Sequence, residues 1–526
     1  MIAGATVAAF LFAACANGTP DTPAQPEPTT PGVVAEPGDS PGGAGTVGAA
    51  PHGNLRLGSL VSPASWDVNG LNVGHFMTPL TMVFDTLLRW DAEGGVEPGI
   101  AESWEYNADR TVLTLHLRPG LTFSDGTALD AEAVAANIDH FRASSGANVH
   151  DADLITGANA VDATTVEIHL SEPDVELLQN LARPLGMMSS PTSWTSADVG
   201  TNPVGSGPYI LDGNATVPGS TYVFHANPNY WDDSFQRFET VTMTVFVDGA
   251  ALTNALMGGQ LDASNFFGDL GALPQLEAAG FNVNTAQLDW FGLMIGDRDG
   301  VLVPCLADVR VRQAINYALN RDGLVAAFRH GLGQATTQIF GPSTNAYQAA
   351  LDARYPFDPA RARELLAEAN CAEFTMTMAM PAVGDPALAA QVQQMLGDVG
   401  INVVVQVLTP GQTIAEMSTG RYPVLMGGLS TTSDFQQAGY TLVQGSPFNF
   451  LNTSNPEVEA LLHTMQTGDA ASASAAGQEL NRYIVENAWF APFYFLDNVI
   501  LTNDTVRLVM PRVNAAMTGY MISPAN

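Results

Sequence analysis

The sequence contains no lysine, and its 19 basic residues are all arginine. Against these stand 53 aspartates and glutamates, which give a formal net charge of −34 at pH 7. Nucleic-acid binding requires clustered cationic side chains that neutralise phosphates, so this charge balance argues against DNA and RNA as partners. The acidity is typical of the solvated surface of a secreted protein.

The apolar N-terminus is too short to span a membrane. It covers fourteen residues, MIAGATVAAFLFAA, whereas a membrane-spanning helix needs ~20 apolar residues. The pattern is typical of the apolar part of a signal peptide, and we expect residues 1–14 to be removed. The stretch LFAAC resembles a bacterial lipobox, which predicts that Cys15 is lipidated; an unmodified signal-peptide cysteine is the alternative.

Cysteine is scarce, with three in the chain. If Cys15 carries a lipid, Cys305 and Cys371 remain, and an exported protein folds in an oxidising compartment. We therefore expect a disulfide between them, with free thiols in a reducing compartment as the alternative. Zinc binding by this pair lacks the close CxxC spacing of zinc sites, and no metal or other cofactor is predicted.

Catalytic motifs are also missing. The nine histidines are scattered, without an HExxH motif, and no P-loop is present. Two short matches, GDSPG at residues 38–42 and GAGTVG at 43–48, lack the preceding strand and following helix that present a nucleophile or hold a dinucleotide. Ser206, in NPVGSGPYI at residues 202–210, lies in a turn stiffened by prolines. A secreted hydrolase is therefore a weaker alternative than a binding protein.

Composition and periodicity divide the chain into a tether and an α/β body. Residues 15–52 are rich in proline and glycine, so we expect a disordered tether there. Apolar spacing predicts a helix over residues 78–90. Further strands and capped helices follow from alternation and from N-cap residues: strands at 54–61, 111–118, 164–170, 240–247, 374–380 and 401–408, and helices after Asp130, Asp358, Asp385 and Asn455. The segments 374–380, 386–399 and 401–408 predict a parallel strand–helix–strand unit.

Four blocks resemble, in the same order, the bacterial extracellular solute-binding proteins of family 5. They are the stretch from Gly94 to Ile138, NPVGSGPYI with NPNYWDD at 227–233, ALMGGQLDA at 255–263, and LADVRVRQAINYALNRDGLV at 306–325. The family comprises the dipeptide, oligopeptide and nickel-chelate receptors of ABC importers. The resemblance covers residues 50–526.

The resemblance implies an α/β fold of the periplasmic-binding-protein type, class II and cluster C, with a hinge between two lobes. The first lobe would comprise residues 53–285 and 497–526, including a subdomain at 91–199. The second lobe would comprise residues 286–496. Such proteins bind ligand between the lobes and close around it.

The resemblance also implies ligand-binding residues. Asp434, in GLSTTSDFQQA, matches the aspartate that pairs with a peptide's α-ammonium; a solvent-facing role is the alternative. Trp290 and Phe291 would form an aromatic wall where the chain enters the second lobe, or else pack inside the hinge. Trp66 and Asp67 lie where the family's first lobe faces the cleft. No arginine can be assigned to a ligand carboxylate.

We therefore expect a monomeric, exported lipoprotein on the outer face of the cell membrane, or a periplasmic one. It would capture di- or oligopeptides and deliver them to the permease and ATPase subunits of an ABC importer. Another solute in the same fold, such as a nickel chelate, a sugar or an opine-like compound, is the alternative.

Overall fold

The computed structural model describes residue 51 and residues 53–525, except 64, 69–76, 92–93, 145, 147, 267, 383, 410–411, 431–432, 511–516 and 520. The predicted signal peptide, Cys15 and almost all of the predicted tether lie outside these residues. The two cysteines of the predicted disulfide lie inside them.

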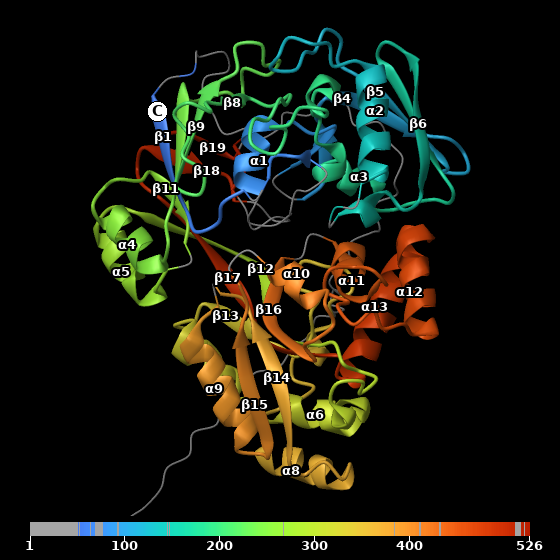
Figure 1. Cartoon of the computed structure of the whole chain (residues 1–526), viewed down its shortest axis with the longest axis vertical. Helices are drawn as coiled ribbons and strands as arrows, with labels where there is room; N and C mark the ends of the chain where they lie inside the picture. Colours follow the sequence, from blue (N-terminus) through green and yellow to red (C-terminus); the bar gives the residue numbers. More distant parts are fainter. Residues whose placement is uncertain are drawn as a thin grey trace, which may run out of the picture. The chain divides into compact units, whose positions relative to one another are not determined.

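A large mixed sheet runs through the described part of the chain (Figure 1). Its strand order is β15-β14-β16-β12-β17-β11-β1-β10-β9-β8, and β13 pairs with β17 beside this path. The strands are β1 (Asn54–Ser59), β8 (Tyr209–Leu211), β9 (Thr221–Ala226), β10 (Thr240–Val245), β11 (Ala263–Asn265), β12 (Asn282–Ile295), β13 (Gly333–Ala335), β14 (Phe374–Met380), β15 (Ile401–Val407), β16 (Val424–Ser430) and β17 (Phe490–Thr502).

The antiparallel pair β12 and β17 joins the two halves of this sheet. At one end β17 pairs with β11 through Ile500 to Thr502, and at the other end β12 pairs with β16 from Asp289 onward. The register between β12 and β17 shifts between Gln287 and Asp289, which leaves one extra residue in β12. Such a bulge bends and twists a strand locally.

Helices cover the half of the sheet that contains β14, β15 and β16 (Figure 1). As predicted, β14 and β15 are parallel and connected through a helix, α9. The helices of this half are α6 (Val309–Tyr317), α7 (Arg321–Phe328), α8 (Pro359–Glu368), α9 (Pro386–Gly397), α10 (Thr413–Met417), α11 (Asp434–Leu442), α12 (Pro456–Thr467) and α13 (Ala470–Glu486). Two hydrophobic clusters, which include Trp290 and Leu293 respectively, fill the space between the sheet and these helices.

The other half carries a second, four-stranded antiparallel sheet in the order β4-β5-β7-β6, which we call the small sheet. Alternate residues of its strands point to one face, so that Leu113, Leu115, Val166 and Ile168 pack against α2 in a shared hydrophobic core. The elements are β4 (Ala101–Tyr106), β5 (Val112–Leu117), α2 (Ala131–Arg142), β6 (Ile155–Asp162), β7 (Thr165–Leu170) and α3 (Leu177–Asn180).

The remaining elements of this half are short. They are α1 (Met77–Val83), β2 (Leu88–Trp90), β3 (Val96–Pro98), α4 (Gly249–Met257), α5 (Leu273–Ala278), β18 (Val506–Leu508) and β19 (Ile522–Pro524). The helix predicted over residues 78–90 is wrong in its second part, because α1 ends at Val83 and residues 88–90 form β2. There Leu88 and Trp90 contribute to the core shared with the small sheet, so strand pairing overrides the helical spacing.

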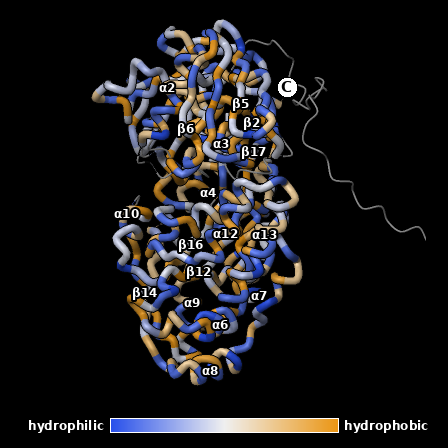
Figure 2. Tube along the Cα trace, turned by 90° about the vertical axis from the view of Figure 1, so that its right-hand side faces the viewer, coloured by the Kyte–Doolittle hydropathy of each residue, from blue (hydrophilic) through white to orange (hydrophobic). Residues whose placement is uncertain are grey.

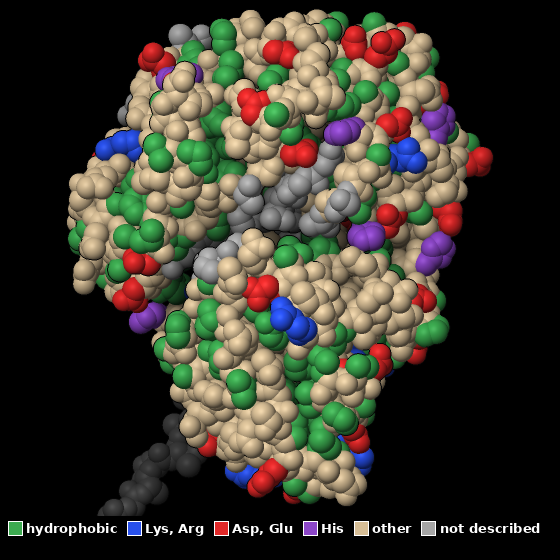
Figure 3. Space-filling model, viewed as in Figure 1, with side chains coloured by type: hydrophobic (Ala, Val, Ile, Leu, Met, Phe, Trp, Pro, Cys, Tyr) green, Lys and Arg blue, Asp and Glu red, His purple; other side chains and the backbone are tan. Residues whose placement is uncertain are grey.

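No helix in the described ranges is long and apolar enough to cross a membrane. Along the chain, hydrophobic and hydrophilic residues alternate over short distances (Figure 2). Acidic side chains are spread over the face shown in Figure 3, where arginines are few.

Candidate ligand-binding site

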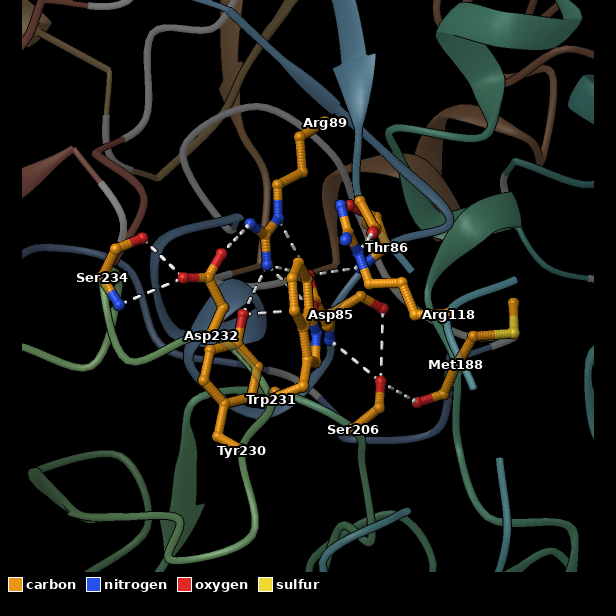
Figure 4. Close-up of polar contacts among 12 residues, drawn as sticks. Asp85, Thr86, Arg89, Arg118, Met188, Ser206, Tyr230, Trp231, Asp232 and Ser234 are labelled. Atoms are coloured by element: carbon orange, nitrogen blue, oxygen red, sulfur yellow. Dashed lines mark hydrogen bonds and ion pairs between the residues drawn. The ribbon is translucent and has the colours of Figure 1, made fainter. Parts of the chain in front are cut away.

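Ser206 lies in a buried structural cluster rather than in a reactive position (Figure 4). Its Oγ accepts the backbone N–H of Asp85 at 3.2 Å and lies 3.2 Å from the carbonyl oxygen of Met188. No histidine or carboxylate side chain takes part in these contacts, so the general base that a nucleophilic serine requires is not among them. The turn NPVGSGPY therefore anchors two chain segments.

Next to Ser206, a buried ion cluster joins residues 85–89 to residues 230–232 (Figure 4). Arg89 donates to Asp85 at 2.9 Å and to Asp232 at 3.1 Å. Burial alone would lower the pKa of Arg89, but the charges of Asp85, Tyr230 and Asp232 and the hydrogen bond to Asp85 together reverse this and raise it. The ring of Trp231 lies between the guanidinium groups of Arg89 and Arg118. The NPNYWDD block thus has a structural role, because its side chains hold the buried arginine Arg89 in place.

A second polar region joins the neighbourhood of the small sheet to α11 and α12. Tyr440 donates a 2.6 Å hydrogen bond to Asn148, and Ser433 donates one of 2.6 Å to Glu176. The backbone N–H of Val175 donates to the carbonyl oxygen of Gln466 at 3.0 Å. These partners are separated by more than 250 residues in the sequence, so the contact is wholly tertiary.

We call this region the acidic contact, because carboxylates gather there. Its members are Asn148, Asp151, Asp174, Glu176 and Arg183 on the small-sheet side, and Ser433, Asp434, Gln436 and Tyr440 on the α11 side. Asp174 is 2% exposed and Glu176 is 8% exposed. Burial raises the pKa of Asp174 to about 7, and burial also raises the pKa of Asp151 and of Glu176.

Asp434 is the first residue of α11. Its two carboxylate oxygens accept the backbone N–H groups of Asn345 and Ala346, both at 3.1 Å. Burial raises the pKa of Asp434, while these hydrogen bonds act in the opposite direction. The charge of Asp434 also raises the pKa of Glu176, so the two carboxylates lie within electrostatic range of each other. The side chains of Thr344 and Asn345 also act as donors that lower the pKa of Asp434, so residues 344–346 together surround this carboxylate with donors.

Several buried polar atoms near β11, β12, β16 and β17 have no hydrogen-bond partner among the described residues. They are Asn265 Oδ1, Trp290 Nε1, Ser430 Oγ, and Oδ1 and Nδ2 of Asn498. In the register of β11 and β17, Asn265 pairs with Ile500, so Asn265 and Asn498 point to the same face of the sheet. Buried polar groups are normally hydrogen-bonded, so these atoms have bonding capacity left for water or for a ligand.

Comparison with known proteins identifies the family. Residues 95–450 match the family model described as Bacterial extracellular solute-binding proteins, family 5 Middle. The chain belongs to this family. It is 28% identical over 510 residues to the glutathione-binding protein GsiB of Pectobacterium atrosepticum, a match that covers 91% of this chain and 93% of the relative.

Solved structures of two-lobed binding proteins have the same fold. The periplasmic binding protein DppA of Helicobacter pylori, in complex with the peptide STSA, superposes with a TM-score of 0.80 at 20% identity and covers 91% of this chain and 99% of its own. NikZ of Campylobacter jejuni, in complex with Ni(L-His), superposes with a TM-score of 0.75 at 20% identity and covers 89% and 99%.

As a member of this family, the protein is a solute-binding receptor of an ABC importer and not an enzyme. Members of the family are extracellular or periplasmic. The predicted fold class, α/β with two lobes, is confirmed. Within the described residues, no group of three or more histidine, cysteine, aspartate or glutamate side chains is arranged to hold a metal ion.

The predicted aromatic residues lie in hydrophobic cores. Trp290 is 0% exposed and contacts Phe490 edge to face, whereas Phe291 stacks on Tyr494 in the neighbouring cluster. Successive strand residues point to opposite faces, so the two rings do not form one wall. Trp290 is buried and Phe291 is partly buried, and a ligand contact for either ring stays a prediction. Only the unpartnered Nε1 of Trp290 offers a polar contact.

The other predicted residues are divided among the core, the surface and the undescribed segment. Trp66 packs edge to face on Tyr222 and Phe224 in the core below β1, and Asp67 follows it half-buried. A ligand contact for either residue stays a prediction. Cys305 and Cys371 form a disulfide, as expected. Cys15 lies outside the described residues.

The structure brings together residues that the sequence did not single out. Glu176 and Gln436 are ordinary polar residues in sequence, and neither belongs to one of the four recognised blocks. The only local signal is Ser433, which caps α11 by accepting the N–H of Gln436. Because Glu176 and Ser433 are 257 positions apart, only the tertiary fold places them in contact.

Proposed function

We propose that this receptor binds short peptides between its lobes and delivers them to an ABC permease. The observation that carries the proposal is the position of Asp434. Its carboxylate is held by two backbone N–H groups at the start of α11, beside a second carboxylate from the opposite side of the acidic contact. A peptide's α-ammonium supplies the positive charge and the hydrogen-bond donors that such a carboxylate accepts.

The peptide backbone would then meet the unpartnered atoms near the sheet. Asn498 offers an unpaired donor and an unpaired acceptor, and Ser430 and Asn265 add further positions. A peptide presents N–H and C=O groups in alternation, so it can satisfy both kinds of atom. These contacts would bind the main chain of the peptide without selecting among peptide side chains.

We infer that the lobes comprise residues 53–285 with 497–526, and residues 286–496. The crossing between residues 496 and 497 falls at the bulge where the register shifts between Gln287 and Asp289, and the crossing between residues 285 and 286 lies just before this bulge on β12. A hinge needs a few residues that absorb the change in backbone angles, and an irregular strand position does so more readily than a regular one. This location supports hinge closure about β12 and β17.

Closure couples peptide binding to transport. Ligand contacts made by both lobes favour the closed state, and only a ligand with different affinity for the two states shifts the balance. We further propose that Cys15 is lipidated and that the tether at 15–52 keeps the receptor at the membrane while it reaches the permease.

A thermal-shift panel tests this function. Neutral tripeptides, glutathione, sugars and nickel-histidine would each be added at increasing concentration, because a ligand at 100 times its Kd stabilises the folded state by ~2.7 kcal/mol. The proposal predicts a concentration-dependent rise in Tm with at least one peptide. A rise in Tm with nickel-histidine or a sugar, but with no peptide, would contradict the proposal and indicate that the receptor binds the alternative class of solute.

A further inference from the structure

The acidic contact holds more carboxyl groups than basic side chains. Asp151, Asp174, Glu176 and Asp434 bring four carboxyl groups to it. In the described part of the chain, the arginine that pairs with one of them is Arg183, 3.5 Å from Asp151. Burying charge without compensation is costly, and burial raises the pKa values of all four carboxyl groups.

One face of α11 points toward these carboxylates. Ser433 and Tyr440 both form hydrogen bonds across the contact. Gln436 lies three residues after Ser433 and four before Tyr440, so helical geometry places it on the same face. The Gln436 side chain is 6% exposed, and its Oε1 has no hydrogen-bond partner among the described residues.

The orientation of the Gln436 amide follows from its neighbour. The hydroxyl hydrogen of Tyr440 goes to Asn148, so the Tyr440 oxygen can only accept from Gln436. The amide must therefore present Nε2–H to Tyr440, which leaves Oε1 turned away from it. Gln436 thus brings a buried acceptor oxygen without a donor to the helix face that carries Ser433 and Tyr440, and a group with several donors would satisfy it.

We propose that the acidic contact is a subsite for a second positive charge on the ligand, so that the receptor prefers peptides carrying a lysine or arginine side chain. This inference rests on the proposed peptide-binding function. A lysine ammonium has three donors, and it would compensate Glu176 while supplying a partner to Gln436 Oε1. Because the subsite is built from both sides of the contact, the same cation would stabilise the closed state.

The preference also distinguishes this chain from a receptor for acidic peptides. Glutathione has two carboxylates and one ammonium, and hence a net negative charge at neutral pH. Like charges in a partly desolvated site repel, so glutathione should bind more weakly than a basic tripeptide. The same charge argument applies to tripeptides with glutamate.

Matched tripeptides provide the test. Lys-Ala-Ala, Ala-Lys-Ala and Ala-Ala-Lys would each be compared by calorimetry with the same peptide carrying acetyl-lysine, which keeps the length and removes the charge. The inference predicts that at least one lysine peptide binds ten times more tightly or better than its acetylated counterpart, a difference of about 1.4 kcal/mol.

Glu176→Gln and Gln436→Met should each bring this ratio close to one. The ratio is taken within each variant, so a change in affinity for the peptide's main chain or α-ammonium affects the lysine and acetyl-lysine peptides equally. The two variants act on opposite sides of the contact, so a folding defect in one leaves the other informative. Glu102→Gln, at an exposed site on β4, removes the same charge and should leave the ratio unchanged.

The outcomes separate the two proposals. Binding of neutral peptides with ratios below twofold at all three positions would overturn the charge preference and leave peptide binding intact. A preference that persists undiminished in both contact variants would also overturn it. Failure of every peptide to bind would overturn the proposed function and this inference together.

Discussion

At the residue scale, Asp434 has a structural role and a proposed binding role. Its carboxylate accepts hydrogen bonds from the backbone N–H groups of residues 345 and 346 and so holds that segment in place even without a ligand. The sequence identified the residue through its resemblance to a family motif, but this backbone contact was not predictable. It joins segments 88 and 89 positions apart, which no local pattern encodes.

Asp434→Asn should weaken binding of Ala-Ala-Ala about 10- to 100-fold, because a charge-assisted hydrogen bond contributes ~1.5–3 kcal/mol. It should also lower the free energy of unfolding by about 1 kcal/mol, since the new NH₂ group meets a backbone N–H that needs an acceptor. Calorimetric titration and urea unfolding measure the two effects. Asp385→Asn, a carboxylate at the start of α9, is the matched control and should preserve affinity. Unchanged affinity in Asp434→Asn would remove Asp434 from the site.

Asp174 predicts a pH dependence of stability. Burial raises its pKa from 3.8 to about 7 in the folded protein. Between these values the folded protein retains a proton that the unfolded chain has lost, so the free energy of unfolding falls as pH rises through this window and levels off above it. Asp151 and Glu176, whose pKa values are also raised, act with the same sign.

Asp174→Asn keeps an acceptor for the N–H of Glu176 and removes the charge. We expect the variant to be more stable than the parent at pH 8, by at most about 4 kcal/mol, with the difference shrinking toward pH 4. Urea unfolding across this range measures it, with Glu102→Gln as the exposed control. A constant difference between variant and parent at all pH values would contradict the raised pKa.

At the element scale, local sequence patterns located the helices that begin with a cap. Asp130, Asp358, Asp385 and Asn455 each accept backbone N–H groups at the start of α2, α8, α9 and α12, because a short polar side chain satisfies the first free donors of a helix. The same reasoning failed for residues 84–90, where pairing between β2 and β3 decides the structure.

The disulfide is the element-scale feature with the largest expected effect on stability. It joins positions 66 residues apart, from the turn before α6 to the segment between α8 and β14. Replacing both Cys305 and Cys371 with serine should lower the free energy of unfolding by ~4 kcal/mol in the chain-entropy model.

Guanidinium unfolding with and without reductant checks this prediction. Reductant should destabilise the parent by a similar amount and leave the double variant unaffected. Equal stability of the parent and the double variant would show that the disulfide does not stabilise the protein by reducing the conformational entropy of the unfolded chain.

At the scale of the whole molecule, the sequence predicted the two-lobed fold through the order of its four blocks. The sequence did not predict that Glu176 would contact α11. That contact depends on the tertiary packing of the two halves of the chain that β12 and β17 connect. The net charge of −34 makes the chain acidic overall, but the proposed preference for basic peptides rests on the carboxyl groups buried at the contact, which composition alone does not locate.

The central claim is that this receptor captures a peptide through its free α-ammonium. Calorimetric titration of the whole receptor with Ala-Ala-Ala and with N-acetyl-Ala-Ala-Ala tests it most directly, because acetylation removes that charge and leaves the rest of the ligand in place. We predict measurable affinity for the free peptide and a loss of about 100-fold or more on acetylation. Equal affinity for the two peptides, or no binding of either peptide or of any peptide in the wider panel, would contradict the account.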